Sequence, residues 1–364
     1  MRAKYTDIEQ HISSFVSVSN IKQGSHNSPK YVVESADGEH YFLKTYTNES
    51  LSRMFEIYKT MQTVFAADIP TAEPIDVGVY SAGGGYILSE CLEAAMNQEA
   101  YIYTNAIFLY MAGRESARFI HKLHNLPIPK TVSYGSCLHI YEKRLILMNE
   151  NKGLVEGLAP LVDDATIYFN KCRSILSNRP ISLLHGDFNG LYKNVVLCKN
   201  GSQKWVDYDE FCYGDPWEEF RWLLDPHIVA KEFENGMLHS YFRGDPPDDF
   251  WVLLPLYLVF QYISQVLRFL SYDENHPHRK RVPYHLKVIK NACLLLRTVS
   301  SHPQWYQAEN NYFQTLAQEK SKQEFVILGL QRTKLMKPIA MVMRALNKIR
   351  HAMKGKRRLA PPLP

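Results

Sequence analysis

The sequence predicts an α+β protein of two lobes: a small antiparallel β-sheet lobe with one main helix, then a larger, mainly helical lobe with an embedded β-hairpin. The 364 residues suffice for two hydrophobic cores, because single cores stop growing near ~250–300 residues. β-rich runs fill the first part of the chain, and helical periodicity follows from about residue 100. We expect lobes at 1–92 and 93–330, and a C-terminal tail at 331–364.

The first lobe is predicted from a hairpin, a helix and a returning strand. Residues 31–44 form two β-rich runs around Asp37-Gly38, a dipeptide typical of hairpin turns. Residues 48–65 place apolar side chains at helical spacing after capping residues, which predicts a helix. Residues 86–92 then predict a buried strand, which would complete an antiparallel sheet.

The second lobe is predicted from apolar residues at helical spacing between about 100 and 180. A β-turn-β segment at 195–207 interrupts these helices around Asn200-Gly201. The most apolar run, Trp251 to Phe260, is about half of the ~20 residues that a transmembrane helix needs. We therefore expect it to be a buried core helix.

Composition indicates an ordinary reduced, cytoplasmic protein. Hydrophobic residues make up 46% and charged residues 22%, which excludes global disorder. The six cysteines form no CxxC pair and no cluster with histidine, so neither a zinc site nor a disulfide framework is expected. The first residues lack the apolar stretch of a signal peptide.

The tail carries a separate positive charge. Ten of the 42 Lys and Arg residues follow residue 330 and no Asp or Glu does, which leaves 32 basic and 37 acidic residues before it. After Pro338, apolar residues recur every three or four positions, which predicts an amphipathic cationic helix. Either its apolar stripe packs on the acidic body, or residues 331–358 dock on an anionic membrane, which would place the protein on the inner face of the cell membrane. Nucleic acid is not expected, because no recognised binding module accompanies the charge.

Three polar residues have the chemistry that phosphoryl transfer requires. Such transfer needs a carboxylate to accept the acceptor's proton, metal ions on the phosphates and a cation on the nucleotide. Asp187 lies in a loop within His185-Gly186-Asp187, where it can face a substrate hydroxyl. Asn194 and Asp207 flank the predicted hairpin, whose folding would bring together two oxygen ligands suited to Mg²⁺.

These motifs resemble the signature of the aminoglycoside phosphotransferase and choline kinase superfamily. The resemblance rests on His185-Gly186-Asp187, Asn194, Asp207-Tyr208-Asp209 and Gly214-Asp215-Pro216, and it spans roughly residues 20 to 300. Asp207 precedes Gly214 by seven residues, the spacing typical of the family. The resemblance implies a bilobal protein-kinase-like fold and an ATP-dependent or other nucleoside-triphosphate-dependent phosphotransferase that uses Mg²⁺.

Carried over residue by residue, the resemblance implies a set of roles. Asp187 would be the catalytic base, and Asn194 and Asp207 the metal ligands. His185 and Asp215 would shape their own loops. The nucleotide would be bound by Lys44 on the α- and β-phosphates, Glu56 as the partner that orients Lys44, Gly24 and Ser25 over the phosphates, and backbone groups of Ser89, Glu90, Cys91 and Leu92 at the base.

Two departures from the family pattern leave alternatives open. The family's asparagine usually comes two residues earlier, at the position of Tyr192, so we infer a longer loop before Asn194. Gly24 stands without the other glycines of a rich phosphate loop. A nucleotide-binding pseudokinase scaffold is therefore the alternative, followed by a protein-substrate kinase, although no Arg separates His185 from Asp187 as in protein kinases.

The acceptor is expected to be a small molecule or saccharide, and a glycolipid or cell-envelope sugar if the tail docks on a membrane. Acidic residues after the hairpin could attract an amino-bearing acceptor, or could simply be solvated: Asp209, Glu210, Glu218 and Glu219.

Overall fold

The computed structural model describes residues 15–21, 29–81, 83–94, 106–129, 135–188, 194–224, 230–298 and 302–312. The chain forms two compact units. Unit 1 contains the described residues before 104 and those from 194 to 211, and unit 2 contains the remaining described residues. The two units are described separately below.

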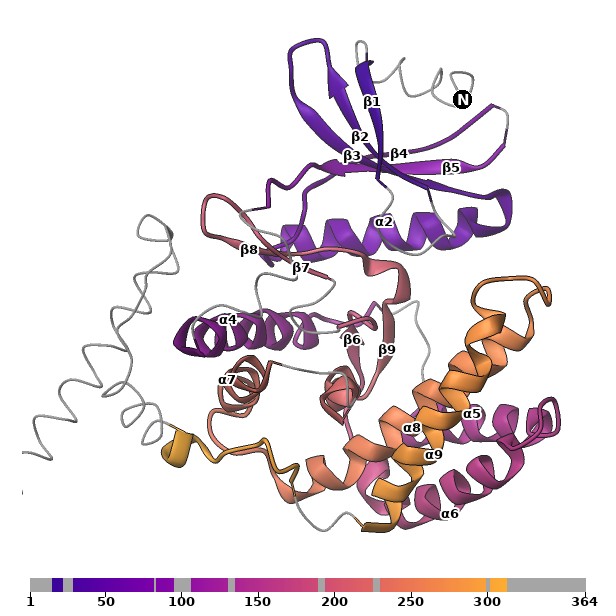
Figure 1. The fold of residues 1–364 in the computed structure, drawn as a ribbon. Coiled ribbons are helices and arrows are strands. Elements are labelled where there is room, and N and C mark those ends of the chain that lie inside the picture. The colour runs from indigo at the N-terminus through magenta and orange to yellow at the C-terminus, as the bar shows by residue number, and fades with distance from the viewer. Residues whose placement is uncertain are drawn as a thin grey trace, which may run out of the picture. The chain divides into compact units, whose positions relative to one another are not determined.

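Unit 1 is built on a five-stranded antiparallel sheet with the strand order β1-β2-β3-β5-β4 (Figure 1). Its strands are β1 (Phe15–Ile21), β2 (Lys30–Ser35), β3 (His40–Tyr46), β4 (Pro74–Val79) and β5 (Gly85–Glu90). The predicted hairpin is confirmed: β2 pairs with β3, and the turn between them places Gly38 at a φ of 85°, which favours glycine. Alternate residues of β2 are buried, as a sheet with one covered face requires.

One helix covers this sheet. The predicted helix at 48–65 corresponds to the 3₁₀ helix η2 (Asn48–Ser50) followed by α2 (Leu51–Ala66). Its buried residues recur at helical spacing and pack towards β4 and β5: Met54, Ile57, Thr60 and Val64.

The embedded hairpin also belongs to unit 1. Strands β7 (Val195–Leu197) and β8 (Gln203–Trp205) pair antiparallel, as the sequence predicts. The amide of Trp205 donates to the Pro70 carbonyl at 2.8 Å, and the Thr71 hydroxyl donates to the Trp205 carbonyl at 2.8 Å. The hairpin is therefore fixed to the segment that follows α2, in the same unit as the sheet.

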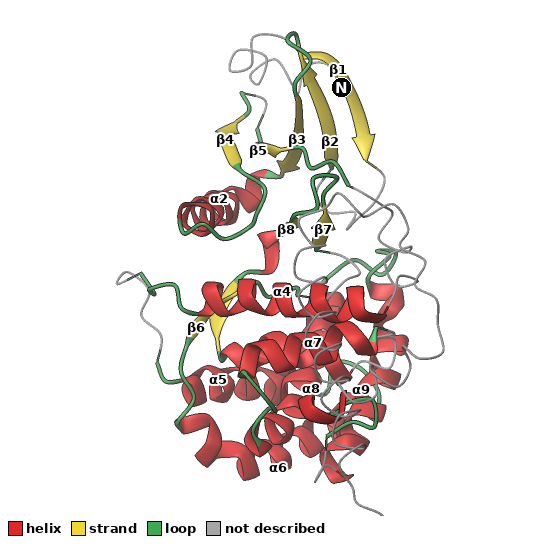
Figure 2. Ribbon diagram, turned by 90° about the vertical axis from the view of Figure 1, so that its left-hand side faces the viewer, coloured by secondary structure: helices red, strands yellow, loops and turns green. Residues whose placement is uncertain are grey.

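Unit 2 is mainly helical, with α4 (Ala106–His124), α5 (Cys137–Asn151), α6 (Leu158–Ser177), α7 (Lys231–Phe242), α8 (Asp248–Leu270) and α9 (Val282–Thr298). Helices α5, α6, α8 and α9 share one hydrophobic core. Figure 2 shows α4 and α7 side by side. Their backbones approach so closely that a Cβ on Gly236 would lie 2.0 Å from the Tyr110 carbonyl oxygen, which only glycine permits.

Two short strands in unit 2 position the loop that contains Asp187. Strand β6 (Ser182–Leu184) pairs antiparallel with β9 (Cys212–Gly214). The loop 185–188 begins where β6 ends, and the 3₁₀ helix η5 (Pro216–Leu224) follows β9 by one residue. The start of η5 and the loop are therefore held by the same pair of strands.

Helix α8 is the apolar run that the sequence singles out. It has 23 residues and is long and apolar enough to cross a membrane, but 72% of its most hydrophobic window is buried inside the protein. It contributes residues throughout the core of unit 2, as expected of a core helix. The predicted amphipathic helix after Pro338 lies outside the described residues.

Candidate active site

Lys44 is the centre of a charged cluster in unit 1. Its ammonium group lies 2.7 Å from Oδ1 of Asp207 and also pairs with Asp209. The ammonium group of Lys30 lies 3.5 Å from Oδ2 of Asp207, and the Tyr46 hydroxyl donates to Asp209 at 3.2 Å. Strands β2 and β3 therefore supply two cations, and the segment after β8 supplies two carboxylates.

The cluster keeps Lys44 charged although it is 7% exposed. Burial lowers the pKa of Lys44, but Asp207 and Asp209 outweigh burial and hold the pKa above its ordinary value. Both carboxylates remain partly exposed, at 31% and 33% of their side chains. A buried, permanently charged ammonium beside two accessible carboxylates is suited to a phosphate group with its metal ion.

The hairpin brings Asn194 and Asp207 to the same end of β7 and β8. The amide of Val206 donates to the Asn194 carbonyl at 3.1 Å. Asn194 directly precedes β7, and Asp207 follows β8 after Val206. Asp207 has a φ of 69°, an uncommon conformation for a residue other than glycine, as the chain turns into the 3₁₀ helix η4 (Tyr208–Glu210). A side-chain amide and a carboxylate are hard oxygen donors, so these residues fit Mg²⁺.

Glu56 does not have the position that the resemblance implies. Its side chain is 60% exposed and pairs with Arg53 at 3.2 Å, whereas the carboxylate partners of Lys44 are Asp207 and Asp209. The physical reason is the orientation of α2, whose buried face contains Met54 and not Glu56.

Arg53 of α2 instead holds the segment that follows β8. Its guanidinium donates to the carbonyl of Asp209 at 2.9 Å and to the carbonyl of Phe211 at 2.6 Å. The same group lies 3.8 Å from the centre of the Phe211 ring, a cation–π contact. Arg53 therefore fixes the backbone at Asp209, one of the two carboxylates that pair with Lys44, and at Phe211.

The predicted base-binding segment begins at the end of β5. Ser89 is buried between β3 and β4, and the amide of Glu90 donates to the Glu73 carbonyl at 2.9 Å. The carboxylate of Glu90 accepts a hydrogen bond from the ammonium group of Lys204 at 2.7 Å. The backbone amide of Glu90 is therefore used by Glu73, and Cys91 and Leu92 follow the strand.

In unit 2, a buried carboxylate holds the loop of Asp187. Glu219 accepts the amide of His185 at 2.6 Å and the amide of Gly186 at 3.0 Å, while the guanidinium of Arg221 donates to the Gly186 carbonyl. Glu219 is fully buried, and burial alone would raise its pKa, but His124, His185 and Arg221 hold that pKa below its ordinary value. The loop is therefore fixed on both sides of Gly186, next to Asp187.

Asp215 is a second buried carboxylate of unit 2. It accepts two hydrogen bonds from Arg179, at 2.8 and 3.0 Å, and one from the Tyr257 hydroxyl at 2.5 Å. It also accepts the amide of Trp217 at 2.9 Å, and so closes its own turn. Asp215 thus connects the start of η5 to α8.

The buried position of Glu218 and Glu219 corrects both interpretations made for them from the sequence. Glu218 is 2% exposed, and its carboxylate binds Arg144 at 2.6 Å and Tyr141 at 2.6 Å. Neither glutamate is solvated or open to an amino-bearing acceptor. The remaining predicted nucleotide residues, Gly24 and Ser25, and the longer loop before Asn194 lie outside the described residues.

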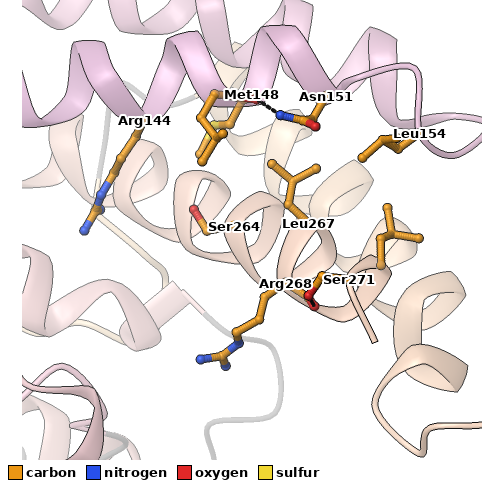
Figure 3. Close-up of a pocket in the computed structure, with 10 residues that line it drawn as sticks. Arg144, Met148, Asn151, Leu154, Ser264, Leu267, Arg268 and Ser271 are labelled. Carbon is orange, nitrogen blue, oxygen red and sulfur yellow. Dashed lines mark hydrogen bonds between the residues drawn. The ribbon is translucent and has the colours of Figure 1, made fainter. Parts of the chain in front are cut away.

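A pocket of about 440 Å³ lies in unit 2 between α5 and the C-terminal half of α8 (Figure 3). Four leucines and Met148 supply its apolar groups, and the polar groups come from Arg144, Asn151, Ser264, Arg268 and Ser271. Arg144 is engaged by Glu218, and Arg268 is exposed.

Comparison with known proteins then decides the family. Residues 17–251 match the phosphotransferase enzyme family, and this range contains Asp187, Asn194 and Asp207. The chain belongs to this family. The sequence matches none of the curated proteins with which it was compared.

Several solved structures that are similar to this chain are aminoglycoside phosphotransferases. The GDP complex of wild-type aminoglycoside 2'-phosphotransferase-IIIa is 15% identical, with a TM-score of 0.61 over 80% of this chain and 97% of that one. Aminoglycoside phosphotransferase APH(4)-Ia is 14% identical, with a TM-score of 0.62 over 80% and 98%. The streptomycin–ATP complex of APH(2")-IIa is 19% identical, with a TM-score of 0.56 over 78% and 94%.

These findings confirm the predicted family, the α+β kinase-like fold and the enzyme class. The protein is a phosphotransferase.

Proposed function

We propose that the protein transfers the γ-phosphate of ATP to a hydroxyl group of a small or saccharide-like acceptor, with Mg²⁺ as cofactor. The observation that carries this proposal is the cluster of Lys44, Asp207 and Asp209 beside Asn194 in a chain of this family. ATP and GDP complexes of similar folds support a nucleoside triphosphate as donor.

The charged and polar residues of the cluster in unit 1 would together hold the donor. Lys44, and Lys30 near it, would bind phosphate oxygens through charge-assisted hydrogen bonds. Asn194 and Asp207 would hold Mg²⁺, which neutralises the charge that develops on the transferring phosphate. With Asp207 as a metal ligand, Asp209 would be the carboxylate that orients Lys44, a role proposed here in place of Glu56.

Asp187 would act on the acceptor. In this role its carboxylate orients the acceptor hydroxyl and accepts its proton as the oxygen attacks phosphorus, while the nucleoside diphosphate leaves with the bridging oxygen. The amides of His185 and Gly186 are fixed by Glu219, so the loop is pre-organised for this contact.

Turnover with a panel of acceptors tests the proposal. ATP consumption and labelled product would be measured with amino sugars, choline and cell-envelope sugars, since kanamycin, streptomycin and hygromycin B are bound in complexes of similar folds. Asp187→Asn should lower turnover at least ~10²-fold. Asp163→Asn, at an exposed position of α6, is the matched control and should leave it unchanged. Turnover that no acceptor stimulates, or that survives Asp187→Asn, contradicts the proposal.

A pseudokinase scaffold is the second candidate, favoured by the two additional residues before Asn194. It predicts tight, Mg²⁺-dependent ATP binding by calorimetry without any turnover. A protein-substrate kinase ranks third and predicts autophosphorylation or labelling of a partner protein.

The tail suggests where the reaction takes place. We propose a cytoplasmic enzyme that contacts anionic membrane through residues 331–358, because the sequence after residue 330 contains ten Lys or Arg residues and no Asp or Glu. The acceptor would then be a glycolipid or lipid-linked saccharide. Flotation with anionic liposomes would be compared between the full chain and a chain that ends near residue 330. Equal flotation of the two chains would contradict the proposed membrane contact of the tail.

A further inference from the structure

Helix α9 exposes a basic face that the proposed reaction does not use. The exposed residues of this helix and of the residue pair before it recur every three or four positions: Lys280, Pro283, Tyr284, Lys287, Lys290, Asn291 and Leu294. At helical spacing these residues form one stripe along the helix. Two of them are large apolar side chains, Tyr284 at 47% exposure and Leu294 at 54%.

The opposite face fixes the orientation of α9. Val282, Ile289 and Cys293 are buried in the core of unit 2, and the thiol of Cys293 lies 4.0 Å from the Leu161 carbonyl of α6. Figure 1 shows α9 lying along α8. Since the buried face packs on α6 and α8, the basic stripe points away from both helices.

The charge of α9 belongs to a wider segregation along the chain. From residue 275 to 308 there are six Lys or Arg residues and no Asp or Glu. Together with the ten cations after residue 330, this leaves 26 basic and 37 acidic residues in the rest of the chain. The net positive charge of the chain therefore comes from two segments without acidic residues. One of these segments, residues 275–308, contains helix α9.

We propose that the exposed face of α9 docks on an anionic lipid bilayer. Lysines on such a face are attracted to acidic headgroups, and their aliphatic stems allow the ammonium groups to reach the headgroup level. Tyr284 and Leu294 would enter the boundary between headgroups and acyl chains, where tyrosine is favoured. A nucleic acid would not bury an exposed leucine among the lysines, whereas a bilayer would. We therefore assign the bilayer as the partner.

The remaining charges near the stripe agree with this assignment. Arg281 is exposed beside the stripe, whereas Arg279 is turned inwards and donates to the carbonyls of Leu270 and Tyr272. The nearest acidic residues before the stripe, Asp273 and Glu274, lie in the loop between α8 and α9. The stripe itself contains none.

Vesicle binding of the full chain tests the proposal. Cosedimentation would be measured with phosphatidylcholine vesicles that contain or lack about a third phosphatidylglycerol, at several salt concentrations. Each surface lysine contributes a factor of about five to partitioning, so Lys280→Gln/Lys287→Gln/Lys290→Gln should lower binding about 100-fold. The control is Lys59→Gln/Lys143→Gln/Lys231→Gln, which makes the same charge change at exposed lysines of α2, α5 and α7.

A second variant separates a bilayer from other anions. Tyr284→Ser/Leu294→Ser keeps the charge and should lower binding to anionic vesicles several-fold, without changing retention on a nucleic-acid column. Equal loss in the two lysine variants, no loss in either, or preferential binding to nucleic acid overturns the proposal. Because no turnover is measured, failure here leaves the proposed phosphotransfer untouched.

Discussion

Asp209→Asn separates the partner of Lys44 seen in the structure from the one implied by sequence resemblance. The substitution keeps the shape of the side chain and removes one of the two negative charges beside a buried ammonium group. Exposed ion pairs contribute ~0–1 kcal/mol, and breaking buried pairs costs ~3–5 kcal/mol. Asp209 is 33% exposed, so we expect the free energy of unfolding to fall by about 1–2 kcal/mol.

Nucleotide binding is the second readout of this variant. If Asp209 orients Lys44 towards phosphate, its loss should weaken ATP binding by up to about tenfold, since a charge-assisted hydrogen bond contributes ~1.5 kcal/mol. Calorimetric titration of Mg²⁺ and ATP measures the affinity, and urea unfolding measures the stability.

Glu56→Gln is the matched control for Asp209→Asn. Glu56 is 60% exposed and pairs with Arg53 at an exposed position, so its charge should change stability by less than ~0.5 kcal/mol and leave ATP affinity unchanged. A Glu56→Gln variant that loses as much ATP affinity as Asp209→Asn would refute the assignment made from the structure.

Three further predictions concern two supports of the site and the packing of α4 against α7. Arg53→Met keeps most of the packing against Phe211 but removes the hydrogen bonds to the turn after β8, so the apparent affinity for Mg²⁺ in ATP binding should fall several-fold in calorimetric titration. Glu219 has a lowered pKa and therefore stabilises the fold above its ordinary pKa of 4.5, an effect lost as the pH falls through the native pKa. Glu219→Gln should lower the free energy of unfolding by ~1–3 kcal/mol at pH 7 and flatten its decline at acid pH, measured by urea unfolding across pH. Gly236→Ala places a Cβ 2.0 Å from the Tyr110 carbonyl oxygen and should destabilise by at least ~1–3 kcal/mol, seen as a lower urea midpoint.

Local signals in the sequence predicted the elements that frame the site. Asp37-Gly38 and Asn200-Gly201 fix two hairpins, because turn chemistry is set by neighbouring residues. Strand β4 was missed, since it begins with Pro74 and contains Gly78, two residues that are unfavourable in strands. It is the edge strand of the sheet opposite β1, where a proline at the first position is tolerated.

Partners distant in sequence could not be predicted in the same way. Asp209 follows Lys44 by 165 residues, and nothing in either neighbourhood specifies the pairing. Glu218 and Glu219 look like surface residues in the sequence, because charged residues are rarely buried without partners, and their partners come from other elements. The position of Glu56 had a local signal: Met54, Ile57, Thr60 and Val64 define the buried face of α2 and leave Glu56 outside it.

Transfer of labelled γ-phosphate from ATP tests the central claim most directly. Wild-type protein and Asp187→Asn would be incubated with Mg²⁺ and the acceptor panel, and products separated by chromatography. We predict Mg²⁺-dependent labelling of a hydroxyl-bearing acceptor by the wild type and a loss of at least ~10²-fold in the variant. A panel with no labelled acceptor, or equal labelling by both proteins, would contradict the account.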